Sequence, residues 1–146
     1  MKKMVIVSGY FNPVHIGHLR LIKAADKLGD KLVVIVNNDK QQLLKKGKII
    51  MKEDERLEIV ESIRYVDEAV LSVDEDPTIV KTLEKVAAKY ANDFQVIFGN
   101  GGDRKSKSEV PESVVCDKYG IEMLFDVGGT DKPNSSSNIN KLRGLE

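Results

Sequence analysis

The chain has 146 residues, of which 23 are basic and 23 acidic, and apolar residues make up 41% of it. This length accommodates one domain with a proper core, which we expect to span residues 1–146. The balanced charge argues against nucleic acid or a membrane surface as partners, and no apolar run approaches the roughly 20 residues of a membrane span. The single cysteine, Cys116, cannot form an intramolecular disulfide and is expected to be a buried thiol. Because no signal peptide precedes the first predicted strand, we expect a cytoplasmic protein.

Predicted strands and helices alternate along the chain. Apolar runs predict strands over residues 4–7, 31–38, 69–73, 94–98 and 121–127. Apolar residues at helical spacing predict helices over residues 16–28, 53–63, 77–90 and 111–119 and from about residue 138. The third of these begins with Asp76 as N-cap and Pro77 as its first residue, whereas residues 39–52 are expected to form a mostly polar loop. The alternation predicts an α/β fold with a five-stranded parallel sheet and helices on both faces, which binds ligands beyond the carboxyl ends of its strands.

His15 and His18 open the first predicted helix, directly after a strand and a turn. The first N–H groups of a helix are unpaired and its dipole favours negative charge, so this place suits an anion. The two imidazoles fall on one face of the first turn, and Gly17 between them lets a phosphate approach the backbone. The arrangement favours a triphosphate over a metal, because zinc needs further ligands and the chain has two histidines and one cysteine.

Three segments of the chain resemble the HxGH nucleotidyltransferase superfamily, which includes small cytidylyltransferases and adenylyltransferases. They are GYFNPVHIGH at residues 9–18, KEDERLEIVESIRYVDEAV at residues 52–70 and SSSNI at residues 135–139. The second is similar to a run in glycerol-3-phosphate and ethanolamine-phosphate cytidylyltransferases. The resemblance implies a Rossmann-like enzyme that transfers CMP from CTP, with Mg²⁺, to a small phosphorylated alcohol such as glycerol 3-phosphate and releases pyrophosphate. The RYVD run at residues 64–67 implies a homodimer.

The resemblance also implies roles for the charged residues of the site. In the similar family His15 and His18 contact the triphosphate and stabilise the transition state. The incoming phosphate monoester is already an anion, so the catalyst has to align two anions and neutralise charge rather than remove a proton. Lys46, chosen among three neighbouring lysines at 45, 46 and 48, is expected to reach the phosphates. Arg56 is expected to hold the substrate phosphate, although a surface ion pair with Glu53 explains it equally well.

Further binding residues follow from the same resemblance. The nucleotide is expected to contact Gly9, Tyr10, Phe11, Asn12, Gly17, Gly99, Asp103, Ser135, Ser136 and Ser137. Lys132 is a second expected ligand of the substrate phosphate. The three serines also suit plain capping of the last helix, and the loop at residues 99–107 also suits a flexible surface loop.

Two departures from the family pattern keep an alternative open. Residues 99–104, GNGGDR, stand where the relatives carry a GxDW-like motif that reads the base, and they lack its tryptophan. Asn12 stands in place of an aspartate, and similar FNPVHxGH forms occur among adenylyltransferases. Adenylyl transfer from ATP to a cofactor or nucleotide phosphate is therefore the alternative. A non-catalytic nucleotide-binding module is a third hypothesis, which the intact HxGH motif disfavours. The basic run at residues 104–107 has no interleaved aromatic residues for stacking bases.

Overall fold

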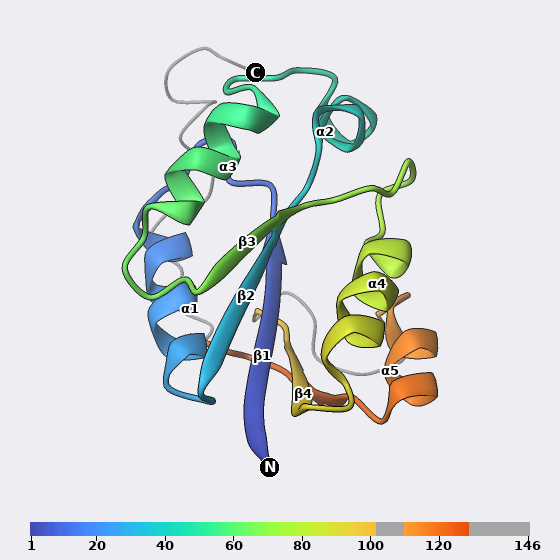
Figure 1. Ribbon diagram of the computed structural model, residues 1–146. Coiled ribbons are helices and arrows are strands. Elements are labelled where there is room, and N and C mark those ends of the chain that lie inside the picture. Colours follow the sequence, from blue (N-terminus) through green and yellow to red (C-terminus); the bar gives the residue numbers. More distant parts are fainter. Residues whose placement is uncertain (102–109, 129–146) are drawn as a thin grey trace.

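Five parallel strands form one sheet in the part of the chain that the structure, a computed structural model, describes, residues 1–101 and 110–128 (Figure 1). The strands are β1 (Lys2–Gly9), β2 (Lys31–Val36), β3 (Glu68–Leu71), β4 (Phe94–Gly99) and β5 (Glu122–Leu124). Their order across the sheet is β3-β2-β1-β4-β5, and every neighbouring pair is parallel. The predicted α/β fold with a five-stranded parallel sheet is confirmed. The strand order reverses between β1 and β4, so the ligand crevice of such a sheet lies at the carboxyl ends of these two strands.

Helices cover both faces of the sheet. They are α1 (Ile16–Asp26), α2 (Asp39–Lys46), α3 (Glu53–Glu61), α4 (Val80–Tyr90) and α5 (Ser113–Tyr119). Helices α1 and α3 lie on one side of the strands and α4 and α5 on the other (Figure 1). None of the helices in residues 1–101 and 110–128 is long and apolar enough to cross a membrane.

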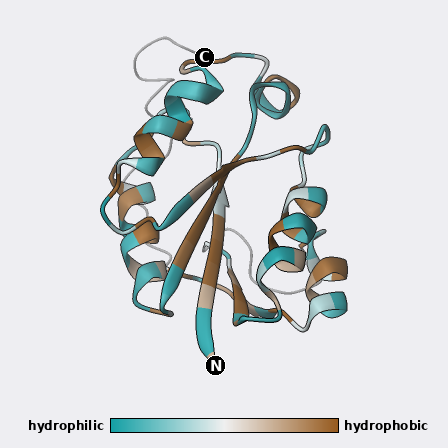
Figure 2. Ribbon diagram, viewed as in Figure 1, coloured by the Kyte–Doolittle hydropathy of each residue, from teal (hydrophilic) through white to brown (hydrophobic). Residues whose placement is uncertain are grey.

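The apolar strands separate two cores. Alternate residues of β1 point to opposite faces, so that Met4 and Ile6 pack beneath α4 and α5 while Val5 and Val7 pack beneath α1 and α3. Figure 2 shows the resulting hydrophobic centre of the sheet. Cys116 belongs to the first core and is 2% exposed, as predicted for a structural thiol.

Helix α2 occupies a segment that the sequence predicted as loop. Asn38 and Gln41 form a capping box at its start, and Gly47 ends it in the left-handed region with a φ of +72°. Its apolar residues Leu43 and Leu44 are 50% and 59% exposed. The helix therefore has no buried apolar stripe, which is why apolar periodicity did not predict it.

Helix α4 begins three residues later than predicted. The carboxylate that caps it belongs to Asp74, which is 2% exposed and accepts hydrogen bonds from the backbone N–H groups of Lys81 (2.8 Å) and Thr82 (2.9 Å). Asp76 instead closes a local turn, in which its carboxylate accepts from the hydroxyl and the backbone N–H of Thr78. These two bonds lower the pKa of Asp76.

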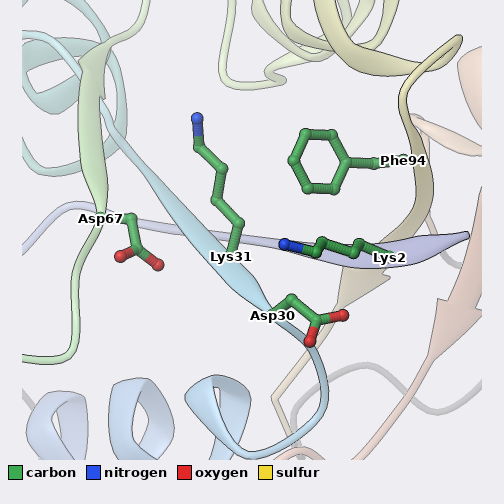
Figure 3. Close-up of a pocket in the computed structure, with 5 residues that line it drawn as sticks. All are labelled: Lys2, Asp30, Lys31, Asp67 and Phe94. Atoms are coloured by element: carbon green, nitrogen blue, oxygen red, sulfur yellow. The ribbon is translucent and has the colours of Figure 1, made fainter.

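A hollow of about 320 Å³ lies at the amino end of the sheet (Figure 3), whereas His15 and His18 follow the carboxyl end of β1. It is lined by Lys2, Asp30, Lys31, Asp67 and Phe94. The two carboxylates cap strands there: Asp30 accepts from the backbone N–H of residue 3, and Asp67 from that of residue 32. The hydroxyl of Tyr90 accepts a hydrogen bond from Lys31 and raises the pKa of that lysine. These side chains therefore have structural roles at the ends of the strands, and we do not assign a ligand to this hollow.

Candidate active site

The loop between β1 and α1 lies at the carboxyl edge of the sheet and is shaped by Phe11 and Asn12. Phe11 has a φ of +54° and a fully buried side chain, and a Cβ at Gly9 would lie 2.9 Å from the tip of its ring. Asn12 is 3% exposed, and its Oδ1 accepts the backbone N–H groups of Ile50 (3.0 Å) and Met51 (2.8 Å). The close packing requires glycine at position 9, and Asn12 ties this loop to the segment before α3.

His15 and His18 form a reciprocal cap at the start of α1. The Nδ1 atom of His15 accepts the backbone N–H of Gly17 at 3.0 Å, and the Nδ1 atom of His18 accepts the backbone N–H of His15 at 3.2 Å. Each neutral imidazole therefore carries its hydrogen on Nε2, where it acts as a donor. The rings stack with centroids 3.9 Å apart, and the edge of Phe11 lies against His18 at 4.8 Å. The structure thus brings both imidazoles to one face, as the spacing predicted.

The backbone of this first turn differs from the expected anion site. The N–H of Gly17 donates to the His15 imidazole, and those of His18 and Leu19 donate to the His15 carbonyl. These three N–H groups are therefore satisfied within the turn, and the imidazole Nε2–H groups are its side-chain donors.

Arg56 is buried, and not at the surface as an ion pair with Glu53 would require. Its side chain is fully buried beneath the loops, where it pairs with Asp39 at 2.8 Å and donates to the backbone carbonyls of Tyr10, Asn37 and Met51. The expected surface ion pair with Glu53 is therefore wrong, because the guanidinium is buried and pairs with Asp39. The expected contact with substrate phosphate stays a prediction. The sequence analysis did not identify Asn37 and Asp39 as partners of Arg56. The polar run at residues 37–39, directly after an apolar strand, could have indicated a site there.

Three exposed lysines, Lys45, Lys46 and Lys48, stand at the end of α2 and just beyond it. The ammonium group of Lys45 lies 4.3 Å from the centre of the Tyr10 ring. This contact brings the basic end of α2 to the loop that precedes the histidines. The choice of Lys46 among the three lysines stays a prediction, and the contact with Tyr10 makes Lys45 a second candidate.

The end of β4 forms the other side of the switch point. Gly99 is buried there, and a Cβ on it would meet Val7 at 3.2 Å and Val127 at 3.3 Å. Asn100 follows, with 6% exposure, and its backbone pairs with that of Leu124 and Val127. The remaining predicted ligands, Asp103, Lys132, Ser135, Ser136 and Ser137, lie outside the described residues.

Comparison with known proteins agrees with this geometry. Residues 6–133 match the model of the cytidylyltransferase-like family. The chain belongs to this family. The expected superfamily is thereby confirmed, and the matched range includes the paired histidines and both loops of the switch point.

Several individual proteins are similar to this chain. The FAD synthase of Aciduliprofundum boonei is 39% identical over 120 residues, which cover 82% of this chain and 73% of that protein. The FAD synthase of Ferroglobus placidus is 45% identical over 84 residues, 58% of this chain and 53% of that protein. The chain thus spans about half the length of several curated relatives that it matches. Among solved structures, the lipopolysaccharide core biosynthesis protein of Thermoplasma volcanium has a TM-score of 0.65 and 31% identity, and the match covers 86% of this chain and 94% of that one.

Proposed function

We propose that this protein is an adenylyltransferase that joins AMP from ATP to the phosphate of FMN, giving FAD and pyrophosphate. The observation that carries the proposal is the 39% identity with an FAD synthase over 82% of this chain. This support favours the adenylyl alternative of the sequence analysis over its main reading, transfer of CMP to glycerol 3-phosphate. The cytidylyltransferase-like family and the paired histidines support nucleotidyl transfer in general.

The chemistry matches the groups that the site offers. An oxygen of the FMN phosphate attacks the α-phosphorus of ATP, one P–O bond forms, and the bond to the β-phosphate oxygen breaks to release pyrophosphate. The attacking phosphate is largely ionised at neutral pH, since its second pKa is about 6, so the step needs no general base. It needs donors that offset the repulsion of two anions and the charge on the equatorial oxygens. We assign this role to the Nε2–H groups of His15 and His18.

Mg²⁺ fits this chemistry as a companion of the triphosphate. Two polar side chains of the neighbouring segments are engaged within the protein: Asn12 accepts two backbone N–H groups, and Asp39 of α2 pairs with Arg56. Within residues 1–101 and 110–128, no three His, Cys, Asp or Glu side chains are grouped to hold a metal ion. We therefore propose that the phosphates of ATP supply most of the ligands of Mg²⁺.

The other predicted site residues stay proposals. Lys46 stays a candidate phosphate ligand. Lys45 is a second candidate, because it contacts Tyr10 in the loop before the histidines. Gly99 at the end of β4 lies where the substrate would cross the switch point. The homodimer implied by residues 64–67 also stays a prediction.

Pyrophosphate release tests the proposal. The purified full chain with Mg²⁺ would be given ATP or CTP, each combined with FMN or with glycerol 3-phosphate. Release is expected with ATP and FMN together and in none of the other three mixtures. Release with CTP and glycerol 3-phosphate, and none with ATP and FMN, would overturn the proposal. A His18→Ala protein serves as the control for contaminating activity.

A further inference from the structure

Arg56 joins three segments of chain at the carboxyl ends of β1 and β2. Its Nη1 donates to the carbonyls of Tyr10 and Asn37, both at 2.6 Å, its Nε donates to the carbonyl of Met51 at 2.9 Å, and its Nη2 donates to Asp39 at 2.8 Å. Four of the five N–H groups of the guanidinium therefore have partners within the protein. The side chain itself has no exposed surface. Arg56 is thus a central link beneath the candidate site.

A continuous series of contacts leads from this link to the histidines. Tyr10, whose carbonyl Arg56 holds, precedes Phe11, whose φ of +54° is unusual for a bulky residue and persists only where its surroundings hold it. The buried ring of Phe11 supports His18 at 4.8 Å, and His18 stacks on His15 at 3.9 Å. A shift of the Tyr10 carbonyl would therefore move Phe11 and with it both imidazoles.

We propose that Arg56 is a positioning residue that holds His15 and His18 in their working geometry through Tyr10 and Phe11. The proposal rests on the proposed function, since it assigns what Arg56 does for the same transfer. A guanidinium suits the task because its planar fork reaches separate carbonyls in fixed directions, which the ammonium of lysine cannot do. Asp39, whose side chain is 25% exposed, compensates the buried charge.

The alternative role for Arg56 is a direct contact with the substrate phosphate. A phosphate would have to reach a side chain that has no exposed surface, and at Nη1 it would have to replace two carbonyls that lie 2.6 Å away. Loss of a direct contact made equally in the bound and the transition state raises KM, whereas loss of alignment lowers kcat. Steady-state kinetics therefore separates the two roles.

The main experiment compares Arg56→Lys with Val60→Ala in the full chain. Val60 lies on the same helix, α3, and is fully buried in the core beneath it, so its truncation tests a general loss of stability. At a temperature below both melting points, Arg56→Lys is expected to lower kcat by about 100-fold, the scale of a 1 Å misplacement. KM for ATP and for FMN should change by less than about threefold, and Val60→Ala should keep the wild-type kcat.

A second variant breaks the same series of contacts at another point. Phe11→Leu keeps an apolar side chain in the core but removes the ring edge that supports His18. It is expected to lower kcat as Arg56→Lys does, and the double variant should lose less than the product of the two effects because both act through one path. If Arg56→Lys fails to fold, Phe11→Leu alone decides, and an unchanged kcat in it would overturn the proposal.

Imidazole NMR provides a reading that does not depend on the substrates. The chain has two histidines, so its ¹⁵N imidazole spectrum contains two ring systems. Arg56→Lys should move the resonances of both rings, and Val60→Ala should leave them in place. If wild-type protein makes no FAD, the proposed function fails, but the spectrum still shows whether Arg56 positions the two imidazoles. Unmoved resonances, an unchanged kcat in Arg56→Lys, or a large rise in one KM at constant kcat would each overturn the positioning role.

Discussion

Replacing His15 by asparagine and by alanine separates the two tasks that its imidazole performs. One nitrogen, Nδ1, caps α1 by accepting the N–H of Gly17 at 3.0 Å. The other, Nε2, is the proposed phosphate donor. Asparagine can place its Oδ1 near the position of Nδ1 and so keep the cap, but it has no atom at the position of Nε2. Alanine removes both.

The two losses have different sizes and different assays. Loss of an N-cap costs about 1 kcal/mol of the free energy of unfolding, which for a chain of 146 residues lowers the melting temperature by about 3 °C. We expect this decrease in His15→Ala and little of it in His15→Asn. Both variants should lose about 10²–10³ in kcat, as is typical when one donor to a developing charge is removed. Calorimetry measures the first loss, and FAD formation from ATP and FMN measures the second.

Two results would refute this reasoning. Equal melting temperatures for the two variants would mean that the cap at Gly17 contributes nothing to α1. Near wild-type turnover in His15→Asn would mean that Nε2 of His15 does not serve the reaction. The bond from the His15 backbone N–H to the His18 imidazole survives in both variants, so the comparison isolates one hydrogen bond.

Three further predictions concern capping, the lysines and alkaline pH. Asp74→Ala should lower the free energy of unfolding by about 2–3 kcal/mol in denaturant titrations, because a buried carboxylate that caps α4 is lost; the matched control Asp76→Ala, in an exposed turn, should change the midpoint little. Lys45→Ala should lower kcat/KM for ATP more than Lys46→Ala does, because Lys45 contacts the loop before the histidines. The reverse order would identify Lys46 as the phosphate ligand. The pKa of Lys31 is raised above its ordinary value of 10.5 by a tyrosine hydroxyl, so its contribution to stability is complete below pH 10.5 and is lost as the pH rises through the folded-state pKa. Thermal melts of wild type should decline more steeply there than those of Lys31→Met, and parallel declines would contradict this.

The sequence was most informative where a pattern is local. The continuous apolar runs predicted the strands, because strands covered on both faces need apolar residues at every position. The alternation of strands with helices then predicted the parallel sheet. The spacing of His15 and His18 predicted their common face, since residues three apart are neighbours on a helix.

What the sequence could not predict depends on distant contacts. Helix α2 is held by the buried amide of Gln41, which donates to the carbonyls of Asp76 and Thr78, rather than by an apolar stripe. The burial of Arg56 depends on the carbonyl of Tyr10, 46 residues earlier in the chain. No short pattern records a partner at that separation, so an arginine amid charged residues was interpreted as a ligand or a surface ion pair.

The sequence motifs also could not decide whether the enzyme uses ATP or CTP. Paired imidazoles and a lysine recognise phosphate groups, which ATP and CTP share. The loop at residues 99–104 lacks the tryptophan of the base-reading motif in similar cytidylyltransferases, and acceptor-binding loops vary in sequence among relatives. Asn12 and the missing tryptophan at residues 99–104 kept adenylyl transfer open as an alternative, and the similarity to FAD synthases favours it over cytidylyl transfer.

Product identity tests the central proposal most directly. Wild-type protein would be incubated with equal concentrations of ATP and CTP, with FMN and Mg²⁺, and the flavin products separated by chromatography and weighed by mass spectrometry. FAD is the expected product, in amounts that match the pyrophosphate released, and His18→Ala should yield about 10²–10³-fold less. A flavin dinucleotide that contains cytidine, or pyrophosphate release that does not depend on FMN, would contradict adenylyl transfer to FMN at this site.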